Sequence, residues 1–356
     1  MERTAQNSGT IEVRAALRFD VERLNAWMER EVEDYCGPLA VEQFRGGQSN
    51  PTYRLTTPSR AYVLRRKPPG KLLPGAHAVD REYRVISALS RQGFPVARAF
   101  ALCEDEDVIG TPFYIMDFVE GRIFWDTDFP ELRREERPAY FDAMNATIAQ
   151  LHRIDPEAAG LGDYGRSGNY FERQIGRWSK QYLADTDAGR VGAMDRLVDW
   201  LPRNIPSDAC EARIIHGDFR CDNMIFDAQE PRVIAVLDWE LSTLGHPLAD
   251  FAYHLMMYRM PAGITTGLAG LDLAALNIPS EAEYVAAYCR RTGRDSISSL
   301  DFYIAFNMFR LAAIVHGIKG RLARGTASSD HAGMMAARLE DLAELAWSQA
   351  VRAGAE

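Results

Sequence analysis

The segment "IIHGDFRCDNMIFD" at residues 214–227 places polar and charged side chains between two apolar stretches that predict buried strands. Within it, Asp218 and Asn223 are five positions apart, and Asp238 follows Asn223 by fifteen residues at the end of the apolar run "VIAVL". Phosphoryl transfer needs a carboxylate beside the attacking hydroxyl, and an amide oxygen and a second carboxylate on Mg²⁺. The spacing therefore predicts Asp218 as the catalytic base and Asn223 and Asp238 as metal ligands.

Two other interpretations of this segment compete with phosphoryl transfer. A polar turn joining two hairpin strands would also be rich in Gly, Asp and Asn. A metallohydrolase cluster could be formed by His216, Asp218, Asp222, Asp238 and His246. The chain has no H-x-H or H-x-x-x-H pair to support such a cluster. The downstream "VLDWE" favours phosphoryl transfer, and we interpret His216 as a structural residue that hydrogen-bonds nearby backbone.

The loop "GGQSN" between two predicted strands is a candidate phosphate-binding segment. Its candidate residues are Gly46, Gly47, Ser49 and Asn50. Small residues let backbone N–H groups approach phosphates closely. A plain hairpin turn would have the same composition. Taken alone, the loop does not decide between these two interpretations.

The strand "AYVLRRK" at residues 61–67 carries the cations that could bind ATP. Arg65 aligns with the lysine of the kinase V-A-I-K motif, and Lys67 lies on the same face of a strand. Either could reach the α/β-phosphates, although an edge strand with a solvated basic face is the alternative. Glu82 on the next predicted helix is the expected acidic partner. Backbone groups of Asp117 to Val119 are expected to contact adenine.

Hydrophobic periodicity indicates the elements that position these residues. Residues 40–119 predict a sheet of about five strands crossed by one helix, with an acidic loop at 104–107 and a loose start over 1–14. Helices are predicted at 20–32, 138–155, 170–184, 190–201, 281–292, 300–320 and 330–352. The composition changes near Gly121, which predicts a nucleotide-binding N-lobe over 1–120 and a catalytic and substrate-binding C-lobe over 121–356.

Composition excludes several classes of protein. The net charge of -9 argues against nucleic-acid binding, which needs a basic face. The five cysteines form no CxxC pair, which is typical of a reduced compartment. We see no signal peptide and no apolar run of about 18 residues. The sequence therefore predicts a cytoplasmic protein with no membrane partner.

Taken in order, the motifs resemble those of the aminoglycoside phosphotransferase-like (APH-like) kinase family over roughly residues 25–330. They are "GGQSN", "VLR", a helix with Glu82, "MDFVEG", "QLHRID", "HGDFRCDN", "VLDWE" and "GHPLADFAYHL". The resemblance implies an α+β, two-lobed protein-kinase-like fold with a small antiparallel-sheet N-lobe that carries one helix, and a larger, mainly helical C-lobe. It implies ATP and Mg²⁺ as cofactors and Asp250 as a brace for the catalytic loop. One departure is Arg65, where many members have lysine.

Only eight residues separate Asp238 from a helix that starts near Pro247, and the chain has no D-F-G or A-P-E motif. We therefore do not expect a protein substrate. The expected substrate is a small molecule with a hydroxyl group. Arg310, Arg321 and Arg324 share one face by helical spacing and are predicted to bind substrate, although a solvated face is the alternative.

The motifs most resemble the branch related to the kinase-like domain of acyl-CoA dehydrogenase family members 10 and 11. That resemblance implies a hydroxyacyl-CoA acceptor. Two other functions stay open: a kinase for aminoglycosides or other small alcohols, and a catalytically inactive nucleotide-binding regulatory module.

Overall fold

The computed structural model describes residues 9–45, 50–70, 77–166, 168–207, 211–262, 267–326 and 332–356. The chain separates into two compact units. Unit 1 contains Met1–Ala143, Glu157–Leu161 and Cys221–Ser242, and unit 2 contains Met144–Pro156, Gly162–Arg220 and Thr243–Glu356. The units are thus built from alternating segments of the chain, and the predicted lobe boundary between residues 120 and 121 stays a prediction.

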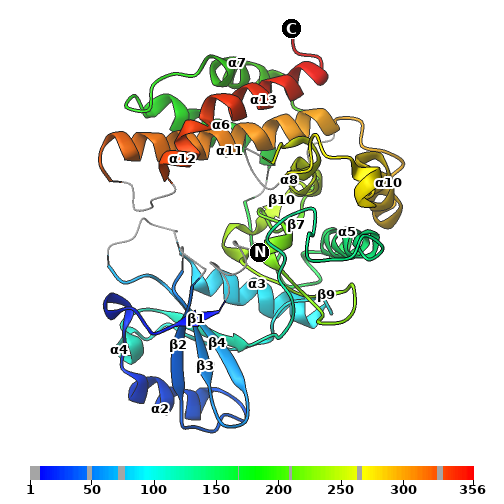
Figure 1. The fold of residues 1–356 in the computed structure, drawn as a ribbon. Helices are drawn as coiled ribbons and strands as arrows, with labels where there is room; N and C mark the ends of the chain where they lie inside the picture. Colours follow the sequence, from blue (N-terminus) through cyan, green and yellow to red (C-terminus); the bar gives the residue numbers. More distant parts are fainter. Residues whose placement is uncertain are drawn as a thin grey trace. The chain divides into compact units, whose positions relative to one another are not determined.

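Unit 1 is built on a six-stranded antiparallel sheet with the order β1-β2-β3-β4-β6-β5 (Figure 1). The strands are β1 (Thr10–Ile11), β2 (Ala40–Phe44), β3 (Thr52–Thr56), β4 (Ala61–Arg66), β5 (Ala99–Cys103) and β6 (Phe113–Asp117). The prediction of about five strands missed β1, which lies in the segment expected to be a loose start. Two residues are too few to show an alternating pattern, and β1 is specified by its pairing with the edge of β2.

Alternation along β4 places Arg65 on the face opposite Tyr62 and Leu64. Tyr62 and Leu64 belong to the buried cluster formed with Leu24 and Trp27 of α2 (Val21–Glu31). Arg65 therefore points to the opposite face of the sheet, where α3 (Val79–Arg91) contacts β5 and β6. The predicted acidic loop at 104–107 is wrong in part, because the short helix α4 (Glu106–Ile109) begins there, capped by the Asp105 side chain.

A short hairpin completes unit 1. Its strands β8 (Met224–Phe226) and β9 (Val233–Val236) pair antiparallel, with Met224 opposite Val236. The 3₁₀ turns η3 (Cys221–Asn223) and η4 (Trp239–Leu241) flank it. Phe226 also exchanges two backbone hydrogen bonds of 2.8 Å with Arg122, so the segment around Gly121 lies against β8.

Unit 2 is mainly helical and is organised around α11 (Leu300–Ala323), which contacts α6, α8, α12 and α13. Its other elements are α6 (Tyr170–Ala184), α7 (Gly192–Trp200), α8 (Pro247–Arg259), α9 (Leu273–Leu276), α10 (Glu281–Thr292), α12 (Ala332–Ala337), α13 (Leu339–Arg352), and the paired strands β7 (Arg213–Ile215) and β10 (Thr243–Gly245). Helix α5 (Arg137–Arg153) has residues in both units. The single helix predicted over 330–352 is wrong, because Arg338 (φ -93°, ψ 1°) leaves the helical conformation.

Among the residues in the described ranges, no helix combines the length and the apolar character that crossing a membrane requires.

Candidate active site

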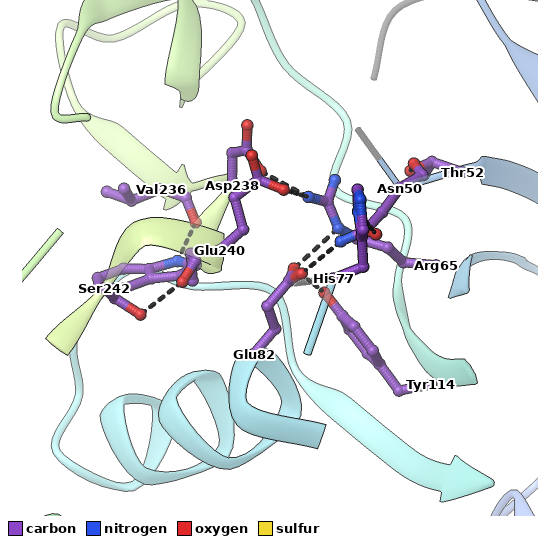
Figure 2. A network of polar contacts seen from close by, with 11 residues as sticks. Asn50, Thr52, Arg65, His77, Glu82, Tyr114, Val236, Asp238, Glu240 and Ser242 are labelled. Atoms are coloured by element: carbon purple, nitrogen blue, oxygen red, sulfur yellow. Dashed lines mark hydrogen bonds and ion pairs between the residues drawn. The ribbon is translucent and has the colours of Figure 1, made fainter. Parts of the chain in front are cut away.

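Arg65 is held by acidic side chains from two parts of unit 1 (Figure 2). Its Nε lies 2.8 Å from Glu82 Oε2 on α3, and its Nη2 lies 2.5 Å from Asp238 Oδ1 after β9. A third carboxylate, that of Glu240, lies 3.6 Å from the same Nη2. The predicted contact between Arg65 and Glu82 is present. Burial by itself would lower the pKa of Arg65, but Glu82 and the neighbouring acids raise it, so the guanidinium stays charged.

Glu82 is almost fully buried and accepts hydrogen bonds from several donors besides Arg65. Asn50 Nδ2 donates to its Oε1 at 2.7 Å, and the Tyr114 hydroxyl donates to its Oε2 at 3.2 Å. Asn50 is itself held by His77, whose Nδ1 lies 2.9 Å from Asn50 Oδ1 (Figure 2). Burial raises the pKa of Glu82 to about 7, against the opposing effect of the Arg65 charge.

The β8–β9 hairpin brings the two predicted metal ligands to the same end of the hairpin. Asn223 ends η3 just before β8, and its carbonyl accepts the backbone N–H of Leu237 at 2.8 Å. Asp238 follows Leu237 directly and has a left-handed backbone conformation with φ of 64°. Trp239 anchors this turn by donating its indole N–H to the Val236 carbonyl at 2.9 Å. The hairpin is confirmed, and metal binding stays a prediction.

A cavity of about 580 Å³ lies within unit 1 beside these side chains. Arg65, Asn223 and Asp238 line it, as do the predicted adenine-contacting residues Asp117 and Val119. Its apolar lining includes Val63, Ile86, Ala97, Met116, Ile225 and Val236. Apolar walls with a few polar groups are typical of a small-molecule site. The residues fit Mg²⁺ and a nucleotide, because carboxylate and amide oxygens suit Mg²⁺ and a guanidinium suits phosphate.

Residues 216–220 of the predicted catalytic loop lie in unit 2, where Asp250 of α8 organises their backbone. The Asp250 carboxylate accepts the backbone N–H groups of His216 and Gly217, each at 2.8 Å, and lies 3.2 Å from His152 Nε2. Gly217 has φ of 86°, a conformation that favours glycine. Burial alone would raise the pKa of Asp250, but hydrogen bonding and charge from His152 and His216 hold it below its ordinary value. These contacts fit the bracing role that the sequence predicted.

Asp218 is held by a residue that the sequence did not indicate. Its Oδ1 accepts the hydroxyl of Tyr253 from α8 at 2.5 Å, and its backbone N–H donates to His216 Nδ1 at 3.2 Å. Arg310 of α11 donates to the Gly217 carbonyl at 2.9 Å, and its guanidinium lies 5.4 Å from the centre of the Tyr253 ring. A tyrosine in an apolar helix is typical of a protein core, so no pattern in the sequence pointed to Tyr253.

The predicted basic face of α11 divides into residues with different contacts. Arg310 contacts the catalytic loop, as described above. Arg324 lies beyond the helix end and donates to Asp185 Oδ1 at 2.7 Å and to Asp187 Oδ2 at 2.9 Å. Arg321 is exposed. Their predicted role in substrate binding stays a prediction, but Arg324 already has two acidic partners within unit 2.

The remaining predicted nucleotide-binding residues fall into two groups. Lys67 lies just after β4, with its Nζ 3.9 Å from Asp80 Oδ1 on α3, and its side chain is partly exposed. Gly46, Gly47 and Ser49 lie outside the described residues.

The histidines of the alternative metal cluster have structural contacts. His246 caps α8 by accepting the backbone N–H of Leu248 at 3.3 Å, and His216 accepts from Asp218 within the loop. In the described part of the chain, no three His, Cys, Asp or Glu side chains gather as a metal site.

Glu240 is a second residue without a predicted role, although it closes the quoted motif "VLDWE". The turn at Asp238 directs the carboxylates of Asp238 and Glu240 toward Arg65 (Figure 2). The position of Glu240, two residues after Asp238, is the sequence feature that could have indicated this contact.

The comparisons with known proteins agree with this arrangement. The model of the phosphotransferase enzyme family matches residues 40–302. Acyl-CoA dehydrogenase family member 10 of Mus musculus is 43% identical over 320 residues, and family member 11 of Gallus gallus is 44% identical over 350 residues. These alignments cover 89% and 96% of this chain but 30% and 44% of the relatives. The chain thus spans less than half the length of these relatives.

Solved structures share the fold. A structure from Ralstonia eutropha JMP134, assigned by name to the aminoglycoside phosphotransferases, has 52% identity and a TM-score of 0.87, and the match covers 94% of this chain and 99% of that one. Aminoglycoside phosphotransferase APH(4)-Ia, in a ternary complex with ADP and hygromycin B, has 16% identity and a TM-score of 0.59, with coverage of 93% and 98%. The predicted α+β protein-kinase-like fold is confirmed. The chain belongs to the phosphotransferase enzyme family and is similar over most of its length to a part of acyl-CoA dehydrogenase family members 10 and 11.

Proposed function

We propose that this protein is an ATP- and Mg²⁺-dependent kinase that transfers the γ-phosphoryl group to the hydroxyl of a small molecule. The observation that carries the proposal is Arg65, bridged between Glu82 and Asp238 at the wall of the unit 1 cavity. Kinases use a cation paired with an acidic helix residue to bind phosphates, and a nearby carboxylate to hold Mg²⁺. The APH(4)-Ia structure with bound ADP supports a nucleotide in a fold of this kind.

Each residue has a stated role in the proposed reaction. Asp218 orients the acceptor hydroxyl and receives its proton as the new oxygen–phosphorus bond forms and ADP leaves. Asn223 and Asp238 would hold Mg²⁺, which neutralises charge on the transferred group when bound. Arg65 binds the phosphates while Glu82 fixes its direction. The backbone of Asp117 to Val119 would receive the adenine.

We further propose that the acceptor is a hydroxyacyl-CoA ester. The support is the name of the relatives, acyl-CoA dehydrogenase family members 10 and 11, which match nearly the whole chain. Arg310 beside the catalytic loop adds a cation that an anionic acceptor would favour. The hygromycin B bound by APH(4)-Ia keeps aminoglycosides as the second candidate class.

ADP release in the presence of hydroxyacyl-CoA esters, aminoglycosides, sugars and choline-like alcohols would test the activity and its acceptor. We expect hydroxyacyl-CoA esters to be turned over best. Asp218→Asn should keep Mg²⁺·ATP binding and lower kcat by about 100-fold or more, the scale of a lost general base. Asp238→Ala should instead abolish Mg²⁺-dependent nucleotide binding in calorimetry. Full turnover by Asp218→Asn would exclude it as the base, and no turnover of any acceptor by the wild type would favour the inactive regulatory module.

A further inference from the structure

The Tyr253 hydroxyl makes a short hydrogen bond to the carboxylate of the proposed base Asp218, and both residues lie in unit 2. The Tyr253 hydroxyl lies 2.5 Å from Asp218 Oδ1, at the short end of the range for a hydroxyl that donates to an ionised carboxylate. The two residues come from different elements, since Asp218 lies in the loop after β7 and Tyr253 lies on α8. A hydrogen bond between separate elements fixes the carboxylate relative to the helix, because its rotamer can no longer change freely.

Tyr253 keeps its own proton in this contact. Burial raises the pKa of Tyr253, and the neighbouring charge of Asp218 raises it further. The phenol therefore acts as a hydrogen-bond donor and does not accept the proton that leaves the acceptor hydroxyl. This distinguishes Tyr253 from a second base, and limits it to orienting the carboxylate.

Arg310 fixes both sides of this contact. Its Nη2 donates to the carbonyl of Gly217, the residue before Asp218, at 2.9 Å. Its guanidinium also lies over the Tyr253 ring, 5.4 Å from the ring centre, where a cation is attracted by the aromatic face. The loop backbone and the tyrosine ring thus share one side chain from α11.

We infer that Tyr253, braced by Arg310, is the positioning residue for the general base Asp218, an inference that rests on the proposed kinase function. As the acceptor oxygen attacks the γ-phosphorus and the bond to ADP breaks, the acceptor proton passes to Asp218 and later to solvent. Tyr253 holds the carboxylate in the direction of that proton and loses none of its own. Arg310 acts on this geometry through the Gly217 carbonyl and the Tyr253 ring.

Tyr253→Phe tests the inference because it removes the hydroxyl and keeps the ring under Arg310. With 3-hydroxybutyryl-CoA as the acceptor, or the acceptor from the ADP-release screen that is turned over best, kcat should fall by about tenfold, as expected for one lost hydrogen bond to a charged group. The KM for ATP should not change.

Tyr182→Phe is the matched control. The Tyr182 hydroxyl donates to Asp195 at 2.6 Å in unit 2 and makes no contact with Asp218, so its loss should lower the melting temperature without altering kcat. Arg310→Gln should lower kcat more than it raises the KM for the acceptor. In an Asp218→Asn background, Tyr253→Phe should have no further effect on kcat.

An unchanged kcat in Tyr253→Phe, with the expected large loss of kcat in Asp218→Asn, would overturn this inference and leave the proposed function intact. A purely acceptor-KM effect of Arg310→Gln would overturn the bracing role of Arg310. Full turnover by Asp218→Asn would overturn the base role of Asp218 and this inference with it, and a wild type that phosphorylates none of the acceptors would overturn the proposed function as well.

Discussion

Arg65 differs from a lysine in the number of acidic groups that it contacts at once. Its Nε pairs with Glu82 and its Nη2 with Asp238, so one planar group connects α3 to the end of β9. A lysine ammonium has a single nitrogen on a flexible stem and lacks this fixed fork. The replacement of lysine by arginine therefore keeps the positive charge and adds a second, simultaneous contact.

Substitution of Arg65 should affect nucleotide binding more than substitution of Lys67. We expect Arg65→Ala to raise the KM for ATP by about tenfold or more, since it removes a charged contact at the cavity wall. Lys67→Ala should have a smaller effect, because Lys67 is partly exposed and lies 3.9 Å from Asp80. Steady-state kinetics with ATP as the varied substrate would measure both. The reverse order would assign the phosphate contact to Lys67.

Glu82 makes the stability of the protein depend on pH. Its pKa rises from 4.5 to about 7 on folding, mainly through burial. The folded protein therefore keeps a proton that the unfolded chain loses between these values, and the stabilisation present at low pH is lost as pH rises through 7. Relative to Glu82→Gln, the wild-type free energy of unfolding should fall by about 3 kcal/mol across this interval. Urea unfolding at several pH values measures the difference, and a difference that stays flat or rises would contradict the shift.

Sequence reasoning predicted the Arg65–Glu82 contact and the hairpin that brings Asn223 and Asp238 to the same end, because these motifs lie on predictable strands and helices. The chemical roles of Asp218, Asn223 and Asp238 stay predictions. Tyr253 could not, because its link to Asp218 depends on how α8 packs against the loop 35 residues earlier in the chain. The contact between Arg324 and Asp185 could not be predicted for the same reason. Helical spacing shows which residues share a face of a helix, but it does not show which residues of other elements that face contacts.

At the level of elements, the β8–β9 hairpin depends on close backbone contact with the segment around Gly121. A Cβ atom at Gly121 would lie 2.3 Å from the Phe226 carbonyl oxygen and 2.5 Å from Ile225 Cγ2. The neighbouring Arg122 is already hydrogen-bonded to Phe226 through both backbone groups. The segment around Gly121 and the strand β8 cannot move apart without breaking these hydrogen bonds. Position 121 therefore requires glycine.

Gly121→Ala should therefore destabilise unit 1. We expect a loss of about 1–3 kcal/mol in the free energy of unfolding, the usual range for an added methyl group in a packed site. Nucleotide affinity should fall as well, because β8 carries Asn223 at its start. Gly176→Ala on α6 is the control: a Cβ there meets nothing within 4 Å, and alanine should stabilise the helix slightly. Chemical denaturation and calorimetric titration with ADP would test both variants, and equal stabilities would contradict the crowding at Gly121.

Long amphipathic elements could be predicted well, and short or interrupted ones could not. The predictions for α6 (Tyr170–Ala184) and α10 (Glu281–Thr292) agree with the structure residue for residue, because several turns of apolar spacing specify a helix. The strand β1 has two residues, and the break between α12 and α13 falls at Arg338, which is a good helix former. Pairing and packing decide such features, and a local pattern does not contain them.

At the level of the whole molecule, the two compact units do not follow the order of the chain. The segment Cys221–Ser242 belongs to unit 1, although the residues before it and after it belong to unit 2. Its contacts are with the sheet side of unit 1, including the hydrogen bond from Val236 to the Pro95 carbonyl at 2.9 Å. We therefore expect this segment to unfold together with unit 1, which it contacts, and not with its neighbours in the sequence.

Hydrogen exchange would reveal this grouping. We expect the backbone amides of β8 and β9 to be protected from exchange to the same degree as those of β4 and β6. All four strands should gain protection when ADP and Mg²⁺ are added. Peptides from α8 and α11 should respond less, since they lie in unit 2. The measurement is exchange followed by mass spectrometry, with Asp238→Ala as the variant that should not respond to nucleotide. Protection of β8 and β9 that instead follows α8 would contradict the assignment.

The contact between Arg65 and Asp238 joins residues 173 positions apart, which has a consequence for biosynthesis. On the ribosome, β4 is made long before its carboxylate partner, by roughly 9–35 s at ordinary rates of translation. During that time the nascent sheet carries Arg65 with Glu82 but without the wall that Asn223 and Asp238 provide. The proposed nucleotide site is therefore incomplete on the ribosome until residue 242 has left the exit tunnel. Until then the nascent chain has its own sheet and the apolar cluster that packs against α2.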